Sequence, residues 1–285
     1  MPESGLGGRV LRALRDVRLR SYLRSKTRRR WDIDYTIDVI RTMKNWRAVL
    51  LEDQLKGLGP VEYVLRNGVR YYVRPGTADR DIMLEIWNER CYTPAGFEIS
   101  PTDVVVDIGA HIGVFSVFAS RLASNGRVYS VEPVPENFEM LKRNLTANGM
   151  KHAVALNLAV SDKRGVMDLF LSGGNTGGHS LLSTFGGDAV TSRISVSTAS
   201  LADLMSENAI SRIDFLKMDC EGAEYAILYS CLDKVLNSIR KISMEYHDID
   251  VGTRNGKAMK AFLESKGFRV DVRTDGWQLL YAVRK

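Results

Sequence analysis

Short apolar runs alternate with helical patterns over most of this chain, and this alternation restricts the fold more than any other feature. Runs typical of strands occur at residues 104–108, 127–132, 154–160, 166–172, 194–198, 213–219 and 239–246. Helical patterns lie among them at residues 115–122, 135–148 and 201–206. A helix at 256–266 and two strands at 268–272 and 279–283, able to pair antiparallel around Asp275-Gly276, complete the pattern. Strands that alternate with helices predict an α/β fold with a doubly wound, mainly parallel sheet.

The chain before residue 104 does not show this alternation of strands and helices. Apolar residues at helical spacing predict a helix over residues 32–56, and a second helix is expected at 79–91. Between them, Asn67-Gly68 separates two β-rich runs and predicts a β-hairpin at residues 61–74. We therefore expect a basic helical extension at residues 1–58 and a globular domain at residues 59–285, whose ligand-binding core spans 103–285.

The net charge of +6 is concentrated in the extension. Residues 1–30 contain ten Lys or Arg against Glu3 and Asp16, a local charge of +8, so the remaining residues sum to −2. Leu6, Val10 and Leu14 recur at helical spacing and would give a basic amphipathic helix. We favour a helix packed on its own domain. Peripheral membrane contact through residues 1–30 is an alternative, and nucleic acid is not expected as a partner.

The cysteines and the hydropathy of the chain bear on its location. Cys91, Cys220 and Cys231 are odd in number and widely spaced, which predicts neither disulfides nor a zinc site. The chain has no run of eighteen apolar residues and no apolar core of a secretory signal. These features predict a cytoplasmic protein, with membrane association through the basic N-terminus left open.

A glycine-bracketed turn follows the first predicted strand of the core. In VVVDIGAHIG, glycine at positions 109 and 113 tolerates positive φ and lets a ligand lie against the backbone. The segment lacks the G-x-G-x-x-G pattern of a pyrophosphate cradle, and the preceding Asp107 suits a cationic ammonium group. Nineteen residues after Gly113, Glu132 ends the second strand, where its carboxylate could bind both ribose hydroxyls. Together these features predict an adenosyl amino acid as ligand.

Carboxylates gather at the ends of two later strands. Asp219, Glu221 and Glu224 fall within six residues around Gly222. Carboxylates crowded at a strand end must be hydrogen-bonded, paired with a cation or used in function. Asp219 is our preferred functional residue, because the two glutamates could simply favour the N-terminus of the next helix. Glu245 and His247 alternate onto one side of the last such strand.

Five segments in order, DIGAHIG, SVEP followed by Asn137, LNLAVSD, KMDCEGAE and MEYH, resemble the FkbM family of S-adenosylmethionine-dependent methyltransferases. The resemblance covers residues 76–250. It implies a class I, Rossmann-like methyltransferase fold with a seven-stranded sheet whose last strand is antiparallel. It also implies O-methylation of a hydroxyl on a sugar, glycan or natural product. His111 departs from the family pattern, in which Asn is more usual after Gly-Ala.

The resemblance also implies which residues meet S-adenosylmethionine. The expected cofactor residues are Asp107, Gly109, Ala110, His111, Gly113, Glu132, Pro133, Ala159, Val160 and Ser161. Methyl transfer from a sulfonium is an in-line displacement in which a base is needed only late, because the hydroxyl becomes acidic as it is alkylated. Asp219, Glu245 and His247 are the candidate catalytic residues.

Residues 172–188 form a long glycine-rich segment that predicts a mobile lid. His179 and Ser180 in this segment, with Glu221 of the acidic motif, are the candidate contacts to a small-molecule or glycan acceptor.

Three alternatives stay open. A metal-assisted O-methyltransferase would use Asp219 and Glu245 as hard oxygen ligands, although a divalent metal is not predicted. A nucleic-acid methyltransferase would use the arginines, but the D/N-P-P-Y/F motif of base N-methylases is absent. A nicotinamide-dependent dehydrogenase would share Glu132 and the turn but lacks G-x-G-x-x-G.

Overall fold

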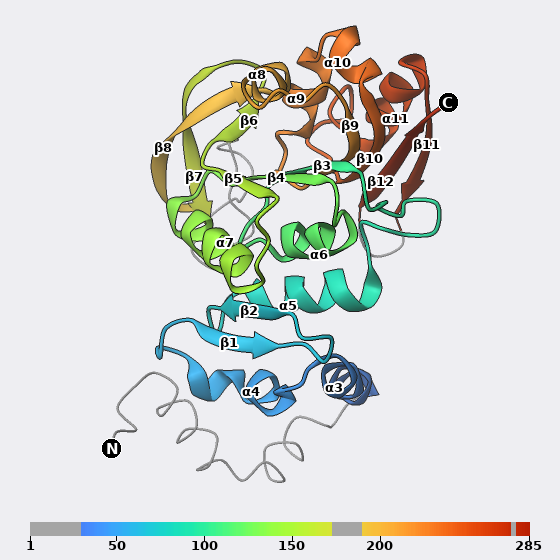
Figure 1. Cartoon of the computed structure of the whole chain (residues 1–285). Helices are drawn as coiled ribbons and strands as arrows, with labels where there is room; N and C mark the ends of the chain where they lie inside the picture. The colour runs from blue at the N-terminus through green and yellow to red at the C-terminus, as the bar shows by residue number, and fades with distance from the viewer. Residues whose placement is uncertain (1–29, 173–189, 275–277) are drawn as a thin grey trace. The chain divides into compact units, whose positions relative to one another are not determined.

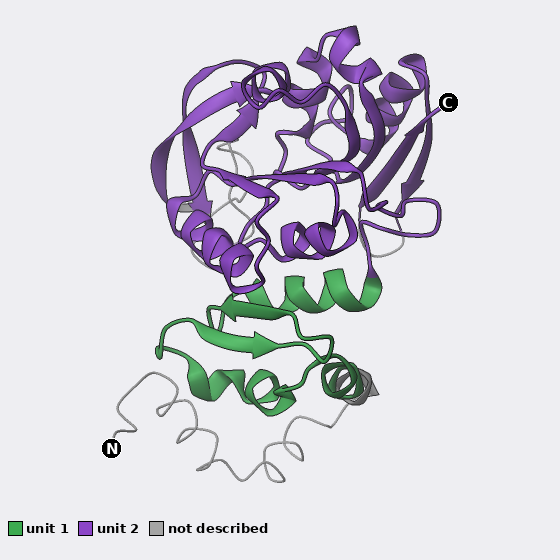
Figure 2. Cartoon of the chain, viewed as in Figure 1, with its two compact units in different colours: residues 1–89 green, residues 90–285 purple. Residues whose placement is uncertain are grey.

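The structure is a computed structural model that describes residues 30–172, 190–274 and 278–285 (Figure 1). The chain divides into two compact units, Met1–Glu89 and Arg90–Lys285 (Figure 2). The predicted hairpin at 61–74 and the helix that follows it belong to the first unit, whereas the sequence suggested that the globular domain begins at residue 59. No helix among the described residues is long and apolar enough to cross a membrane.

The first unit combines short helices with a hairpin. Its described elements are α3 (Arg30–Thr42), α4 (Trp46–Leu50), the 3₁₀ turn η1 (Glu52–Leu55), β1 (Val61–Val64), β2 (Arg70–Val73), α5 (Asp79–Leu84) and the π-helical turn η2 (Glu85–Glu89). The hairpin is confirmed, since β1 and β2 pair antiparallel. The single helix predicted at 32–56 is wrong. It breaks at Asn45, whose side chain donates to the carbonyl of Glu62 and accepts from the amide of Val64, both at 2.8 Å.

The second unit is built on a seven-stranded sheet. Its strands are β3 (Val104–Ile108), β4 (Arg127–Val131), β5 (Ala153–Leu156), β9 (Ile213–Met218), β10 (Ile239–Glu245), β11 (Phe268–Arg273) and β12 (Leu279–Arg284). They are arranged in the order β11-β12-β10-β9-β3-β4-β5. The strand β12 is antiparallel to both of its neighbours, β10 and β11, and the other strand pairs of this sheet are parallel. The expected seven-stranded sheet with an antiparallel last strand is confirmed.

Helices cover both faces of this sheet (Figure 1). They are α6 (Val114–Leu122), α7 (Pro135–Ala147), α8 (Leu201–Glu207), α9 (Glu224–Ser230), α10 (Asp233–Asn237) and α11 (Gly256–Ser265). Helices α6 and α7 lie on one face, and α8 to α11 contribute to a core cluster on the other. Because strands such as β3 are buried on both faces, they read as continuous apolar runs. Because β3, β4, β5, β9 and β10 are parallel, their carboxyl ends lie at the same edge of the sheet.

A second sheet of three strands is inserted after β5. It contains β6 (Ala159–Ser161), β7 (Gly165–Ser172) and β8 (Val190–Ser200) in the order β6-β8-β7. The single strand predicted at 154–160 is therefore wrong, because the chain leaves the large sheet at Leu156 and enters the small one at Ala159. The predicted lid falls almost wholly on residues 173–189, outside the described residues.

Candidate active site

The glycine turn after β3 has the expected backbone but a different reason for its glycines. Gly109 and Gly113 have φ of 74° and 84°. A Cβ on Gly109 would lie 1.7 Å from the carbonyl oxygen of Asp219, and one on Gly113 would lie 2.5 Å from Leu141 Cδ1. The missing Cβ atoms thus make room for the end of β9 and for α7. The expected approach of a ligand to this backbone stays a prediction.

Asp107 does not present an open carboxylate. Its side chain is fully buried, Oδ2 accepts a 2.6 Å hydrogen bond from Ser116 Oγ, and Oδ1 lies 3.3 Å from Lys217 Nζ. The charge of Asp107 is balanced inside the protein by Lys217, and its expected contact with a cofactor ammonium stays a prediction.

Lys217 is the buried cation that links the turn to β9. Its side chain is 4% exposed, and Nζ donates to the carbonyl of Gly109 at 2.9 Å and lies 3.7 Å from Asp219 Oδ2. Burial disfavours the ammonium, but Asp107 and Asp219 outweigh it and raise the pKa of Lys217. Sequence reasoning missed this residue. The available signal was a lysine inside a buried strand, which requires a carboxylate partner.

Glu132 lies beside the turn at the end of β4. Its buried carboxylate accepts backbone hydrogen bonds from His111 at 2.8 Å and Val134 at 3.0 Å, and one from Asn137 Nδ2 at 3.4 Å. Burial raises the pKa of Glu132 to about 7, although these hydrogen bonds oppose the shift. The turn and this acid therefore form one structural unit at the carboxyl edge of the sheet.

The segment after β5 is arranged differently from the expectation. Ala159, Val160 and Ser161 are buried and pair with β8 in the small sheet. The residue that reaches the Glu132 segment is Asn157, whose Nδ2 donates to the carbonyls of Glu132 at 2.8 Å and Pro133 at 3.1 Å. No periodic or compositional signal singled out Asn157.

Four of the sequence-predicted residues meet in an acidic cluster around His247. Its Nδ1 lies 3.0 Å from Glu224 Oε1, and its Nε2 lies 3.3 Å from Glu221 Oε2 and 3.9 Å from Glu245 Oε1. Burial, then the charge of Asp219, raises the pKa of Glu221 to about 7 and that of Glu245 to about 8. Burial disfavours the imidazolium, but the bond to Glu224 outweighs it and raises the pKa of His247 to about 9. The surrounding acids therefore favour the protonated form of His247.

Asp219, which lies beside Lys217, also contacts Tyr92, a residue that the sequence analysis missed. The hydroxyl of Tyr92 donates to Asp219 Oδ2 at 2.9 Å. The Tyr92 ring is buried and packs edge-on against Phe115 at 5.6 Å between centroids. Burial, then Asp219, raises the pKa of Tyr92, so the hydroxyl stays a donor at neutral pH.

His179 and Ser180 fall outside the described residues. Within the part of the chain that the structure describes, no group of three or more His, Cys, Asp or Glu is placed to hold a metal ion. Cys91, Cys220 and Cys231 are half-buried and are not joined to one another by disulfides.

The sheet order, the glycine turn after its first parallel strand and the buried acid after its second define a class I, Rossmann-like methyltransferase. The model of the Methyltransferase FkbM domain matches residues 107–270. The chain belongs to the FkbM family of methyltransferases. It is an S-adenosylmethionine-dependent enzyme, which sets the dehydrogenase alternative aside.

Individual relatives agree with this assignment. The chain is 31% identical over 224 residues to the 31-O-demethyl-FK506 methyltransferase FkbM of Streptomyces tacrolimicus, covering 67% of this chain and 82% of that protein. It is 27% identical over 239 residues to the methyltransferase sdnD of Sordaria araneosa, covering 73% and 89%. Among solved structures, M. jannaschii TYW2 in complex with AdoMet is similar at 13% identity over 79% of this chain and 84% of that one, with a TM-score of 0.42.

Proposed function

We propose that this enzyme methylates a hydroxyl of a small molecule or glycan, and that Glu245 accepts the hydroxyl proton. The observation that supports this most is the position of Glu245, a half-buried carboxylate 3.9 Å from an imidazolium at the carboxyl end of β10. The printed name of the Streptomyces relative, a 31-O-demethyl-FK506 methyltransferase, describes methylation of an oxygen on a small molecule. That likeness favours the same kind of acceptor here.

The residues at the sheet edge fit S-adenosylmethionine, which supplies a methyl group on a positively charged sulfur. Glu132 would accept the ribose hydroxyls, since a carboxylate has lone pairs beyond those its backbone donors use. Asp219 replaces Asp107 as the group that would receive the ammonium, because its side chain is 30% exposed and Asp107 is fully buried. Its backbone carbonyl also packs directly against Gly109.

We favour Glu245 among the three candidate bases. His247 is protonated and held between Glu224 and Glu221, so it has no basic nitrogen to offer at neutral pH. Asp219 Oδ2 accepts a hydrogen bond from Tyr92 and lies 3.7 Å from Lys217 Nζ, so this oxygen is already engaged by two protein groups. A base works best when its pKa lies near the working pH, and the pKa of Glu245 is raised to about 8.

Glu245→Gln tests the assignment. We expect kcat to fall by about 10²–10⁴-fold, the usual contribution of a positioned base, while the Kd for S-adenosylmethionine stays within twofold. Titration calorimetry measures the Kd, and release of S-adenosylhomocysteine measures turnover on a panel of glycosides and hydroxylated natural products. Glu264→Gln, an exposed change at the end of α11, is the matched control.

The same assay separates the two remaining alternatives. Turnover on tRNA or DNA, with none on hydroxyl acceptors, would replace the proposal by nucleic-acid methylation. Loss of turnover in EDTA that Mg²⁺ restores would support the metal-assisted route. Full turnover by Glu245→Gln would rule out Glu245 as the base.

A further inference from the structure

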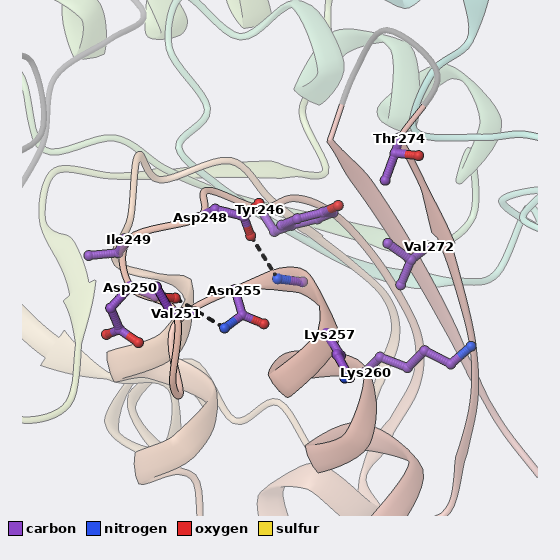
Figure 3. A pocket seen from close by; sticks show the side chains of 11 residues that line it. Tyr246, Asp248, Ile249, Asp250, Val251, Asn255, Lys257, Lys260, Val272 and Thr274 are labelled. Carbon is purple, nitrogen blue, oxygen red and sulfur yellow. Dashed lines mark hydrogen bonds between the residues drawn. The ribbon is translucent and has the colours of Figure 1, made fainter.

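A pocket of about 740 Å³ lies beside the N-terminus of α11, at the carboxyl ends of β10 and β11 (Figure 3). Its volume falls within the range of small-molecule sites, about 300–1,000 Å³. Tyr246 and Asp248 line it, whereas His247 between them belongs to the acidic cluster. The glycine turn and Glu132 are not part of its wall. The pocket is therefore distinct from the site already described.

The carboxylates of this pocket already accept hydrogen bonds from protein groups. Asp248 Oδ1 accepts from the amide of Gly256 at 3.0 Å, and its Oδ2 accepts from Gln278 Nε2 at 3.2 Å. Asp250 Oδ2 accepts from Arg254 Nε at 2.6 Å, and its Oδ1 accepts three amides of its own loop. These carboxylates fix the loop before α11, and Asp250 is paired with a cation, whereas Asp248 keeps its charge because both of its donors are neutral.

The lysines of the pocket have fewer charged partners than its carboxylates have hydrogen-bond donors. Lys257 is exposed and forms no ion pair with any described residue, and Lys260 has Glu264 at 3.9 Å as its nearest acid. Three residues apart on one helix, the two lysines share a face. They also lie in the first turns of α11, where the helix dipole favours negative charge. The two lysines are therefore the groups of this pocket that could receive an anion.

Apart from Asn255 and Thr274, the rest of the wall is mainly apolar. Tyr246 is buried, and Val272 at the end of β11 is half-buried beside it in the pocket (Figure 3). We propose that this pocket binds a small molecule with an apolar body and one anionic group, a carboxylate, phosphate or sulfonate, which the two lysines receive. This inference goes beyond the methyl-transfer reaction and does not depend on the choice of acceptor.

Two probes with the same apolar body test the proposal. The anion 8-anilino-1-naphthalenesulfonate and its neutral counterpart N-phenyl-1-naphthylamine differ only in the sulfonate. For the first probe we expect one site per chain by calorimetry, and a loss of affinity of about tenfold or more in Lys257→Ala/Lys260→Ala. Affinity for the neutral probe should change by less than about twofold. The double variant Lys257→Arg/Lys260→Arg should bind the anionic probe with nearly the affinity of the wild type, because it keeps both positive charges.

Two controls make the result specific to this pocket. Lys151→Ala removes an exposed lysine outside the pocket wall and should leave both probes unaffected. All variants should bind S-adenosylmethionine as the wild type does. Equal loss of both probes, an unchanged affinity for the anion, or a parallel loss of cofactor binding would overturn the proposal. Failure of the wild type to bind S-adenosylmethionine would defeat the proposed function alone, because the probe titrations do not depend on it.

Discussion

At the scale of single residues, the ionisation of Glu132 should control cofactor affinity. Burial raises its pKa to about 7, so near neutral pH the protonated and charged forms coexist. Only the charged form offers acceptors to two ribose hydroxyls while keeping its backbone bonds. We expect the Kd for S-adenosylmethionine to rise as pH falls from 8 to 6, approaching about tenfold per unit well below the pKa. Titration calorimetry at several pH values measures this slope.

Two variants show whether Glu132 causes the slope. Glu132→Gln should bind weakly at every pH and lose the pH dependence, because the amide does not titrate. Glu245→Gln should retain the slope. A wild-type Kd that is equal at pH 6 and pH 8 would contradict this account.

At the scale of elements, the ion pair of Asp107 and Lys217 joins β3 to β9, where the two residues are register partners. Lys217→Met should lower the free energy of unfolding by about 3–5 kcal/mol, because it leaves a fully buried carboxylate without its cation. Asp107→Asn/Lys217→Met should recover most of this loss, since neither charge is then buried. Urea unfolding measures both. A double variant no more stable than Lys217→Met would show that the ion pair is not what holds these strands together.

The elements also show how far the sequence could be interpreted. The strands of the large sheet and the hairpin were predictable because their periodicity and turn chemistry are local. The predicted strand at 154–160 failed because a side-chain contact, from Asn157 to the Glu132 and Pro133 carbonyls, divides it between two sheets. The helix over 32–56 failed for the same kind of reason at Asn45.

The residues of the candidate site also divide into those with a local sequence signal and those recognised only by a contact across the chain. The glycine turn, Glu132 and the acidic cluster carry local signals, so the sequence identified them. Tyr92 contacts Asp219 across 127 residues, and nothing near Tyr92 in the sequence indicates this bond. The pairing of Asp107 with Lys217 could not be predicted, because an acid before a glycine turn has the same local sequence whether or not a buried lysine faces it.

At the scale of the whole molecule, several groups at the carboxyl edge of the large sheet bind protons near neutral pH that the unfolded chain would release. The pKa is raised to about 7 for Glu132 and Glu221, to about 8 for Glu245 and to about 9 for His247. Burial is the largest cause for the three acids, and the bond to Glu224 overcomes burial for the histidine. For each group the folded pKa exceeds the ordinary value, which is 4.5 for the acids and 6.5 for histidine.

These shifts determine how stability depends on pH. A group with a raised folded pKa contributes stability that is complete below its unfolded pKa and is lost as pH rises through its folded pKa. The folded enzyme therefore binds more protons than the unfolded chain, and the melting temperature without cofactor should fall steadily from pH 6 to pH 9. Thermal scans in matched buffers measure this trend. Glu221→Gln/Glu245→Gln should flatten it because two of the stored protons are gone, whereas exposed Glu264→Gln should not. A melting temperature that rises toward pH 9 would mean that the acidic cluster is charged and stabilised in the folded enzyme, and the assignment of Glu245 as a base tuned to neutral pH would lose its support.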